Sequence, residues 1–232
     1  MSAQLPLALR WPAQQRFDAF VPGENGVAVD LLRRAAIETA QTSLYLSGNL
    51  GSGRTHLLIA TCAAANEAGR SAQYLPLATL HANAPASIRA FGGSDLLALD
   101  DVDAIAGDAA AEHALFDLYN RCRAEGATLL FVASAPPAQI GLTLPDLVSR
   151  LSACTQIALK PLTEDARRDL LRERAVARGI ELDDAVVDWL FAREKRDIAS
   201  LLGVLDRVDA ASLAAQRRVT VPFLRKMLDG DI

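Results

Sequence analysis

Short apolar runs alternate with helical segments over the first 160 residues of the chain. The apolar runs have the length of strands and cover residues 43–47, 72–75, 95–100, 128–134 and 155–159. Apolar residues recur at helical spacing in the segments 28–41, 55–68 and 110–125. Because parallel strands need long crossover connections and are covered on both faces, this alternation predicts an α/β fold with a five-stranded parallel sheet between helices.

The pattern changes near residue 160, after which it predicts only helices. They are expected at residues 163–178, 183–193, 196–215 and 220–228, with Thr220 as an N-cap and Pro222 in the first turn of the last one. We therefore divide the chain into a flexible N-terminal tag (1–12), an α/β domain (13–160) and a small all-helical lid domain (161–232).

Composition excludes several classes of protein. The formal net charge of −4 argues against a protein that coats nucleic acid, which needs a clustered positive field. No apolar run is long enough to cross a membrane and no signal peptide is evident, so we expect a cytoplasmic protein without membrane contact. Cys62, Cys122 and Cys154 lie in separate apolar runs, which predicts buried, reduced thiols.

The stretch "GNLGSGRT" lies between the first predicted strand and its helix. It matches the phosphate-loop pattern G-x-x-x-x-G-K-[ST], except that arginine replaces lysine. Glycines let the backbone approach an anion, and the helix start presents its positive end to it. The predicted phosphate-binding residues are Gly48, Gly51, Ser52, Gly53, Arg54, Thr55 and His56. A tight strand-to-helix turn is the alternative.

Two further features bear on a bound metal and on hydrolysis. Thr55 can offer its hydroxyl to Mg²⁺, and "LLALDD" at 96–101 is an apolar strand that ends in two carboxylates. Such a Walker B strand would place Asp100 in the Mg²⁺ shell and Asp101 toward an attacking water, although a solvated turn can also contain two aspartates. Because the planar guanidinium of Arg54 differs from a compact ammonium, we expect nucleotide binding to survive better than hydrolysis.

Several stretches in the same order resemble the DnaA group of AAA+ proteins. They span nearly the whole chain and read "RFDAFVPGEN" (16–25), "GNLGSGRTHLL" (48–58), "LLALDDVDAIAGD" (96–108), "LFDLYNR" (115–121), "LPDLVSRL" (144–151) and "AQRRVTVPFLRKML" (215–228). The resemblance implies an AAA+ nucleotide-binding core that is followed by a helical lid.

The resemblance also implies residues around the nucleotide. The stretch that lies against adenine in this group corresponds here to Phe17, Phe20, Val21, Pro22 and Asn25, although the two phenylalanines can equally cover the sheet edge. The sensor 1 position falls on Ser134, where the group commonly has aspartate. The sensor 2 position falls on Arg196 in "RDIASL", which by itself reads as a solvated helix arginine.

Arg150 in "LVSRL" occupies the position of the group's arginine finger, a cation that reaches the nucleotide of a neighbouring subunit. Taken alone it would be an ordinary surface arginine. The full initiators of this group continue into a helix-turn-helix DNA-binding domain, whereas this sequence ends at Ile232. We therefore expect no sequence-specific DNA binding.

The N-terminal stretch "QLPLAL" resembles the group's Q-L-x-L-x-L peptide for the sliding clamp of DNA polymerase III. Gln4 would supply hydrogen bonds, Pro6 would keep the backbone extended, and Leu7 and Leu9 would fill the apolar pocket. Leu5 is also among the predicted partner-binding residues. Alternatively, these leucines fold back onto the domain or support self-association.

The resemblance points to a regulator of replication initiation. It would bind ADP or ATP with Mg²⁺, dock on the clamp, and use Arg150 to stimulate hydrolysis of ATP held by DnaA, while its own hydrolysis stays weak or absent. An autonomous AAA+ ATPase using Asp101 and a DnaA-like adaptor or loader remain the alternatives. A homodimer is left open.

Overall fold

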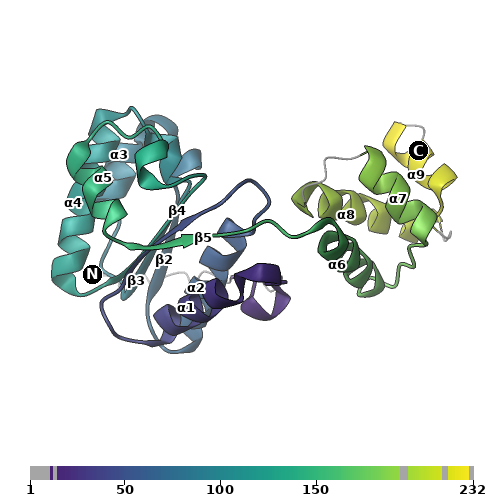
Figure 1. The fold of residues 1–232 in the computed structure, drawn as a ribbon, viewed down its shortest axis with the longest axis horizontal. Helices are drawn as coiled ribbons and strands as arrows, with labels where there is room; N and C mark the ends of the chain where they lie inside the picture. The colour runs from purple at the N-terminus through teal and green to yellow at the C-terminus, as the bar shows by residue number, and fades with distance from the viewer. Residues whose placement is uncertain (1–10, 13–14, 194–197, 216–218, 230–232) are drawn as a thin grey trace, which may run out of the picture. The chain divides into compact units, whose positions relative to one another are not determined.

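The computed structural model describes residues 11–12, 15–193, 198–215 and 219–229 (Figure 1). The chain divides into two compact units, residues 1–161 and 162–232.

The first unit is built on one parallel sheet. Its strands are β1 (Ser43–Ser47), β2 (Ala72–Pro76), β3 (Leu96–Asp100), β4 (Thr128–Ala133) and β5 (Thr155–Ala158). They lie in the order β2-β3-β4-β1-β5, and every neighbouring pair is parallel. The five strands predicted from the apolar runs are thus confirmed, as is the α/β class.

Helices cover both faces of this sheet (Figure 1). On one face lie α1 (Gly26–Ile37) and α2 (Arg54–Glu67), which pack on Leu44 and Leu46 of β1. On the other face lie α3 (Ala84–Ala90), α4 (Ala109–Glu125) and α5 (Pro145–Ser152), in the same core cluster as Tyr45. Alternate residues of β1 therefore face opposite cores, which explains why the strand is buried throughout.

The sequence pattern did not predict α3 and α5. Each is short and buries only two apolar side chains, Ala84 and Ile88 in α3 and Leu147 and Leu151 in α5, so neither shows a helical repeat. Short 3₁₀ turns also connect the elements. They are η1 (Phe17–Ala19), η2 (Gly23–Asn25), η3 (Leu77–Thr79), η4 (His81–Asn83), η5 (Val102–Ile105) and η6 (Pro137–Gln139).

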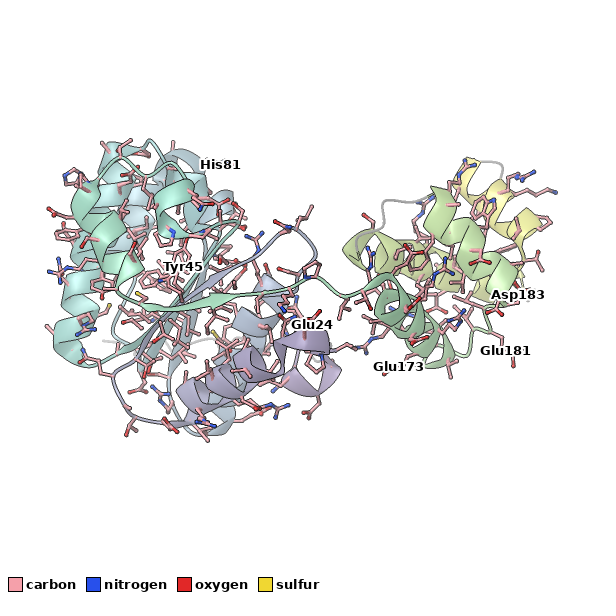
Figure 2. The ribbon with its side chains drawn as sticks, viewed as in Figure 1. Glu24, Tyr45, His81, Glu173, Glu181 and Asp183 are labelled. Atoms are coloured by element: carbon pink, nitrogen blue, oxygen red, sulfur yellow. The ribbon has the colours of Figure 1, made fainter. Side chains whose placement is uncertain are left out.

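The second unit is helical, as predicted for the lid. It contains α6 (Glu164–Val176), α7 (Asp184–Arg193), α8 (Ile198–Ala215) and α9 (Val221–Asp229). Its core includes Leu171, Val187, Phe191, Leu201 and Leu224. Acidic side chains such as those of Glu173, Glu181 and Asp183 lie on its exposed surface (Figure 2). Within the described part of the chain, no helix is long and apolar enough to cross a membrane.

Arg70 joins three elements at the amino edge of the sheet. Its Nη1 donates to the carbonyl oxygens of Ala35 and Ala36 at 2.7 and 2.8 Å, at the end of α1. Its Nη2 donates to the carbonyl oxygen of Asp95 at 3.1 Å and to Thr128 Oγ1 at 2.9 Å, just before β3 and at the start of β4. One guanidinium thus holds the end of α1 to the starts of β3 and β4.

Replacing this guanidinium tests its contribution to stability. We expect Arg70→Ala to lower the free energy of unfolding by ~2 to 3 kcal/mol, because partly buried acceptors lose a charged donor. Urea denaturation followed by circular dichroism measures the change. Arg34→Ala on the exposed side of α1 is the control, with an expected change within ~0.5 kcal/mol. Equal effects of the two substitutions would contradict this role.

Candidate functional site

The glycine-rich loop at 48–53 joins β1 to α2 at the carboxyl edge of the sheet. Gly53 precedes the first turn of α2 with a φ of +86°, a conformation that favours glycine, and no side chain caps the helix there. A Cβ at Gly53 would lie 2.5 Å from the Phe20 ring, and one at Gly48 would lie 3.1 Å from the Leu159 carbonyl oxygen. The loop therefore leaves the first N–H groups of α2 open to an anion.

Two polar atoms of this loop are buried without a partner. Ser52 Oγ and Arg54 Nη1 make no hydrogen bond within the described structure. Leaving a buried polar atom unsatisfied is costly, so each such atom is a candidate partner for a water molecule, an ion or a ligand. A hydroxyl and a guanidinium beside open backbone N–H groups fit phosphate oxygens. The loop has the donor set of a phosphate site.

Thr55 and Leu50 lie on the solvent side of the loop. The Thr55 side chain is exposed in the first turn of α2, and Leu50 at the loop tip is 82% exposed. Thr55 is thus accessible from solvent, as its predicted role as a Mg²⁺ ligand requires.

The strand β3 ends in the two predicted carboxylates. Asp100 is buried, and its carboxylate accepts hydrogen bonds from the Tyr74 hydroxyl at 3.1 Å and from the Asp101 N–H at 3.0 Å. Asp101 is half-buried with a φ of +53°. Burial and then the charge of Asp100 raise the pKa of Asp101, whereas the Arg54 guanidinium lowers it. The phosphate loop and the carboxylates therefore meet at one edge of the sheet.

Ser134, at the predicted sensor 1 position, is held by Asp103, which was not among the predicted site residues. Asp103 accepts hydrogen bonds from Ser134 Oγ at 2.9 Å and from its backbone N–H at 3.2 Å. In the sequence, Asp103 is visible only as the third carboxylate of "LLALDDVD", two residues after the predicted Walker B pair. The next residue, Ala135, accepts a hydrogen bond from the Tyr45 hydroxyl at 2.9 Å, inside the unit (Figure 2). Both contacts restrain the loop after β4.

The stretch predicted to lie on adenine packs against the phosphate loop through Phe20. Its ring lies 5.3 Å from the His56 ring, centroid to centroid, and His56 Nε2 lies 2.9 Å from the Arg16 carbonyl oxygen. Phe17 is buried in the core instead, while Val21 is half-buried and Pro22 is exposed. Phe20 is thus the phenylalanine of this stretch that borders the site.

Asn25 has a role that the sequence did not indicate. It is buried, and its amide donates to the carbonyl oxygen of Lys160 and accepts from the Lys160 N–H, both at 2.8 Å. Lys160 Nζ also pairs with the Glu24 carboxylate at 2.6 Å. The side chain of Asn25 is therefore engaged with the chain just after β5, and its contact with a base remains a prediction.

Arg150 lies apart from this cluster of residues. It is exposed in the last turn of α5, and its guanidinium makes no hydrogen bond or ion pair with any described residue. Because α5 packs on the sheet face opposite to α1 and α2, Arg150 projects from the layer that does not carry the phosphate loop. Arg196 and the predicted tag residues Gln4, Leu5, Pro6, Leu7 and Leu9 lie outside the described residues.

Comparison with solved structures shows the same fold. Domain III of the Thermotoga maritima replication initiation protein DnaA is 20% identical, with a TM-score of 0.78 over 95% of this chain and 98% of that one. AMPPCP-bound DnaA from Aquifex aeolicus is also 20% identical, with a TM-score of 0.71 over 88% of this chain and 68% of that one. The Thermotoga maritima RuvB Holliday junction branch migration motor is 17% identical, with a TM-score of 0.67 over 94% of this chain and 72% of that one.

Two family models match consecutive parts of the chain. The bacterial DnaA ATPase domain matches residues 12–158, and the lid domain of Hda matches residues 164–228. These matches confirm the AAA+ fold and the resemblance seen in the sequence motifs. Because the first model covers well over half of the sequence, the chain belongs to the family of bacterial DnaA ATPase domains and carries a lid of the Hda type.

Proposed function

We propose that this chain regulates replication initiation by binding ADP and the DNA polymerase sliding clamp and by stimulating hydrolysis of ATP bound to DnaA. The observation that carries this proposal is the position of Arg150. This cation is exposed and without a partner in the described part of the chain, on the sheet face away from the chain's own phosphate loop. This position supports a role of Arg150 on the nucleotide of another protein.

The direction of α5 supports action on a neighbour. Because β4 and β5 run parallel with β1 between them, the chain must return from the carboxyl edge of the sheet to its amino edge before β5 begins. The helix α5 makes part of this return, with Arg150 in its last turn. Arg150 is therefore carried away from the edge that holds the phosphate loop. In trans, its guanidinium would stabilise charge on the transferring phosphoryl group.

The residues around the phosphate loop support binding of a nucleoside diphosphate. Arg54, Ser52 and the open N–H groups at the start of α2 would hold the phosphates, and Phe20 borders the site where a base would lie. Thr55 and Asp100 would hold Mg²⁺, whose charge offsets the carboxylates beside the phosphates. Bound ADP would serve to order the loops at the carboxyl edge of the sheet.

Three features favour weak hydrolysis by the chain itself. Arg54 replaces the lysine of the phosphate-loop pattern, and an arginine is not equivalent to a lysine beside β- and γ-phosphates. Asp101 is shorter than the glutamate usual in AAA+ motors, and burial disfavours its charged form. The hydroxyl of Ser134 is bonded to Asp103 rather than directed to a phosphate. Together they favour nucleotide retention over turnover.

The paired carboxylates support one other candidate, an autonomous AAA+ ATPase or loader. Asp100 is buried at the end of β3 and Asp101 follows it directly, which is the arrangement of a Walker B strand. In that case the chain would hydrolyse its own ATP, and Arg150 would serve a neighbouring copy of the same chain, for example in a homodimer. An adaptor without initiator-inactivating activity would need neither Asp101 nor Arg150.

Nucleotide binding is tested through the unpartnered guanidinium of Arg54. We expect Arg54→Ala to weaken ADP binding by roughly 10- to 100-fold, the effect of losing a hydrogen bond to a charged group. Isothermal titration calorimetry measures the dissociation constant. Arg54→Lys keeps the charge and should lose less affinity, and Arg34→Ala should bind ADP as the unmodified chain does. Unchanged affinity in Arg54→Ala would exclude a phosphate role for this residue.

The finger assignment is tested by Arg150→Ala. Because arginine fingers contribute roughly 10³- to 10⁵-fold in rate, the variant should lose stimulation of DnaA-bound ATP hydrolysis while retaining its fold and its ADP affinity. Arg89→Ala, at an exposed arginine of α3 on the same face of the sheet, is the matched control and should stimulate normally. Stimulation at the unmodified rate by Arg150→Ala would show that another residue supplies the charge.

Clamp binding is tested at the tag. An isolated peptide of this size should bind with a dissociation constant of about 1 µM, near −8 kcal/mol, and the several sites on a clamp ring raise its effective concentration. Replacing Gln4 and Leu5 with alanine should abolish capture by immobilised clamp and clamp-dependent stimulation without lowering the melting temperature. Ile37→Ala, which shortens an exposed aliphatic side chain elsewhere, is the control. If the variant still binds the clamp but melts at a lower temperature, the tag stabilises the folded domain and does not bind the clamp.

A further inference from the structure

Glu112 is a completely buried carboxylate in the first turn of α4. It forms no ion pair with any residue that the structure describes. Instead, its oxygens accept hydrogen bonds from two loops. Oε1 accepts from the Gly107 N–H at 2.8 Å. Oε2 accepts from the Thr143 N–H at 2.9 Å, the Thr143 hydroxyl at 3.0 Å and the Leu144 N–H at 2.7 Å.

The burial of Glu112 makes these hydrogen bonds strong and specific. A carboxylate that leaves water without compensation is very unfavourable, and here the compensation comes from four loop donors and from the positive end of α4. Displacing either loop would remove hydrogen bonds from a carboxylate that lies in a low-dielectric interior, which is energetically costly. Glu112 therefore restrains two loops that are more than thirty residues apart in the sequence.

The two loops carry different parts of the proposed machinery. Gly107 ends the segment that begins after β3 with Asp101 and contains Asp103. Leu144 immediately precedes α5, which has no side-chain cap at this end. The helix carries Arg150 six residues farther on. A single carboxylate thus joins the loop after the Walker B strand to the start of the helix that presents the finger.

Hydrophobic packing and hydrogen bonds act together on α5, since Leu142 and Leu144 before the helix also pack against the core. Leu147 and Leu151 are buried, so they determine which face of the helix turns toward the core. The hydrophobic effect that drives this packing is non-directional, whereas hydrogen bonds depend on direction. The hydrogen bonds from Thr143 and Leu144 to Glu112 restrain the start of α5. Through the rigid helix they also restrain the position of its last turn, which contains Arg150.

We propose that Glu112 is a positioning residue for Arg150: it holds the start of α5 against the loop after β3, and thereby sets where the finger is presented to a partner's nucleotide. This inference rests on the proposed function of Arg150, but the positioning of α5 can be measured separately. Glu112 itself touches neither nucleotide nor partner.

The functional test uses Glu112→Gln in the full chain. Glutamine has only one acceptor oxygen, so its NH₂ group must face the N–H donors of one loop, and the bridge between the two loops should be broken. The maximal stimulated rate at saturating regulator should fall by roughly 10²-fold, the effect of misplacing a catalytic group by about 1 Å, while ADP affinity and the half-saturating concentration stay unchanged. Combined with Arg150→Ala, the change should cause no further loss of stimulation.

A control separates positioning from general stability. Thr128→Val removes a buried hydroxyl that binds Arg70 at the amino edge of the sheet, far along the strands from both loops. It should lower stability without lowering the maximal rate. Thr143→Val removes only the hydroxyl donor to Glu112, so it should retain the fold and lower the maximal rate by a smaller factor. An unchanged rate in both Glu112→Gln and Thr143→Val, or an equal loss in Thr128→Val, would overturn the proposal.

Hydrogen–deuterium exchange gives a readout that does not depend on DnaA. Amides in the segment 143–152 should exchange at least ten times faster in Glu112→Gln than in the unmodified chain, with β1 and α2 unchanged. If the unmodified chain fails to stimulate DnaA, the proposed function is wrong, and faster exchange in this segment alone still supports the anchoring of α5 by Glu112. Unchanged exchange in the segment contradicts the anchor whether or not stimulation is seen.

Discussion

The parallel direction of all five strands determines where the chemistry of this chain can lie. Loops that follow strands begin at the carboxyl edge of the sheet, so the phosphate loop after β1, the carboxylates after β3 and Ser134 after β4 come together there. Each crossover must then return to the amino edge along one of the two faces. The helix that carries Arg150 returns on the face opposite to α2, so the sheet lies between α5 and the helix that follows the phosphate loop.

Among the described residues, the charges around Asp101 at the carboxyl edge are two further carboxylates and the Arg54 guanidinium. Asp100, Asp101 and Asp103 lie on or just after β3, and Arg54 faces them from the phosphate loop. A polyphosphate entering this site would be repelled by the carboxylates unless a divalent cation neutralised part of the charge. Nucleotide binding by this chain should therefore depend on Mg²⁺, with Arg54 as the protein's own contribution of positive charge.

Sequence patterns predicted the sheet well because its strands are uninterrupted apolar runs, and they predicted the phosphate loop because its glycines and Thr55 have fixed spacing. Two kinds of feature escaped them. The helices α3 and α5 are too short to show a repeat, although α5 carries Arg150. Asp103, Glu112 and the amide of Asn25 act through partners more than thirty residues away, and such pairs appear only when the chain is folded. Motif spacing identifies local sites but not the side chains that tie them together.

In the proposed function, this chain promotes hydrolysis of ATP held by another protein and not of ATP in its own site. This proposal is tested most directly by loading DnaA and the chain with ATP carrying two distinguishable γ-phosphate labels and mixing them in the presence of clamp on DNA. We expect rapid release of the label from DnaA only, with the chain's own label retained. Rapid release of the chain's label, with that of DnaA unchanged, would contradict it.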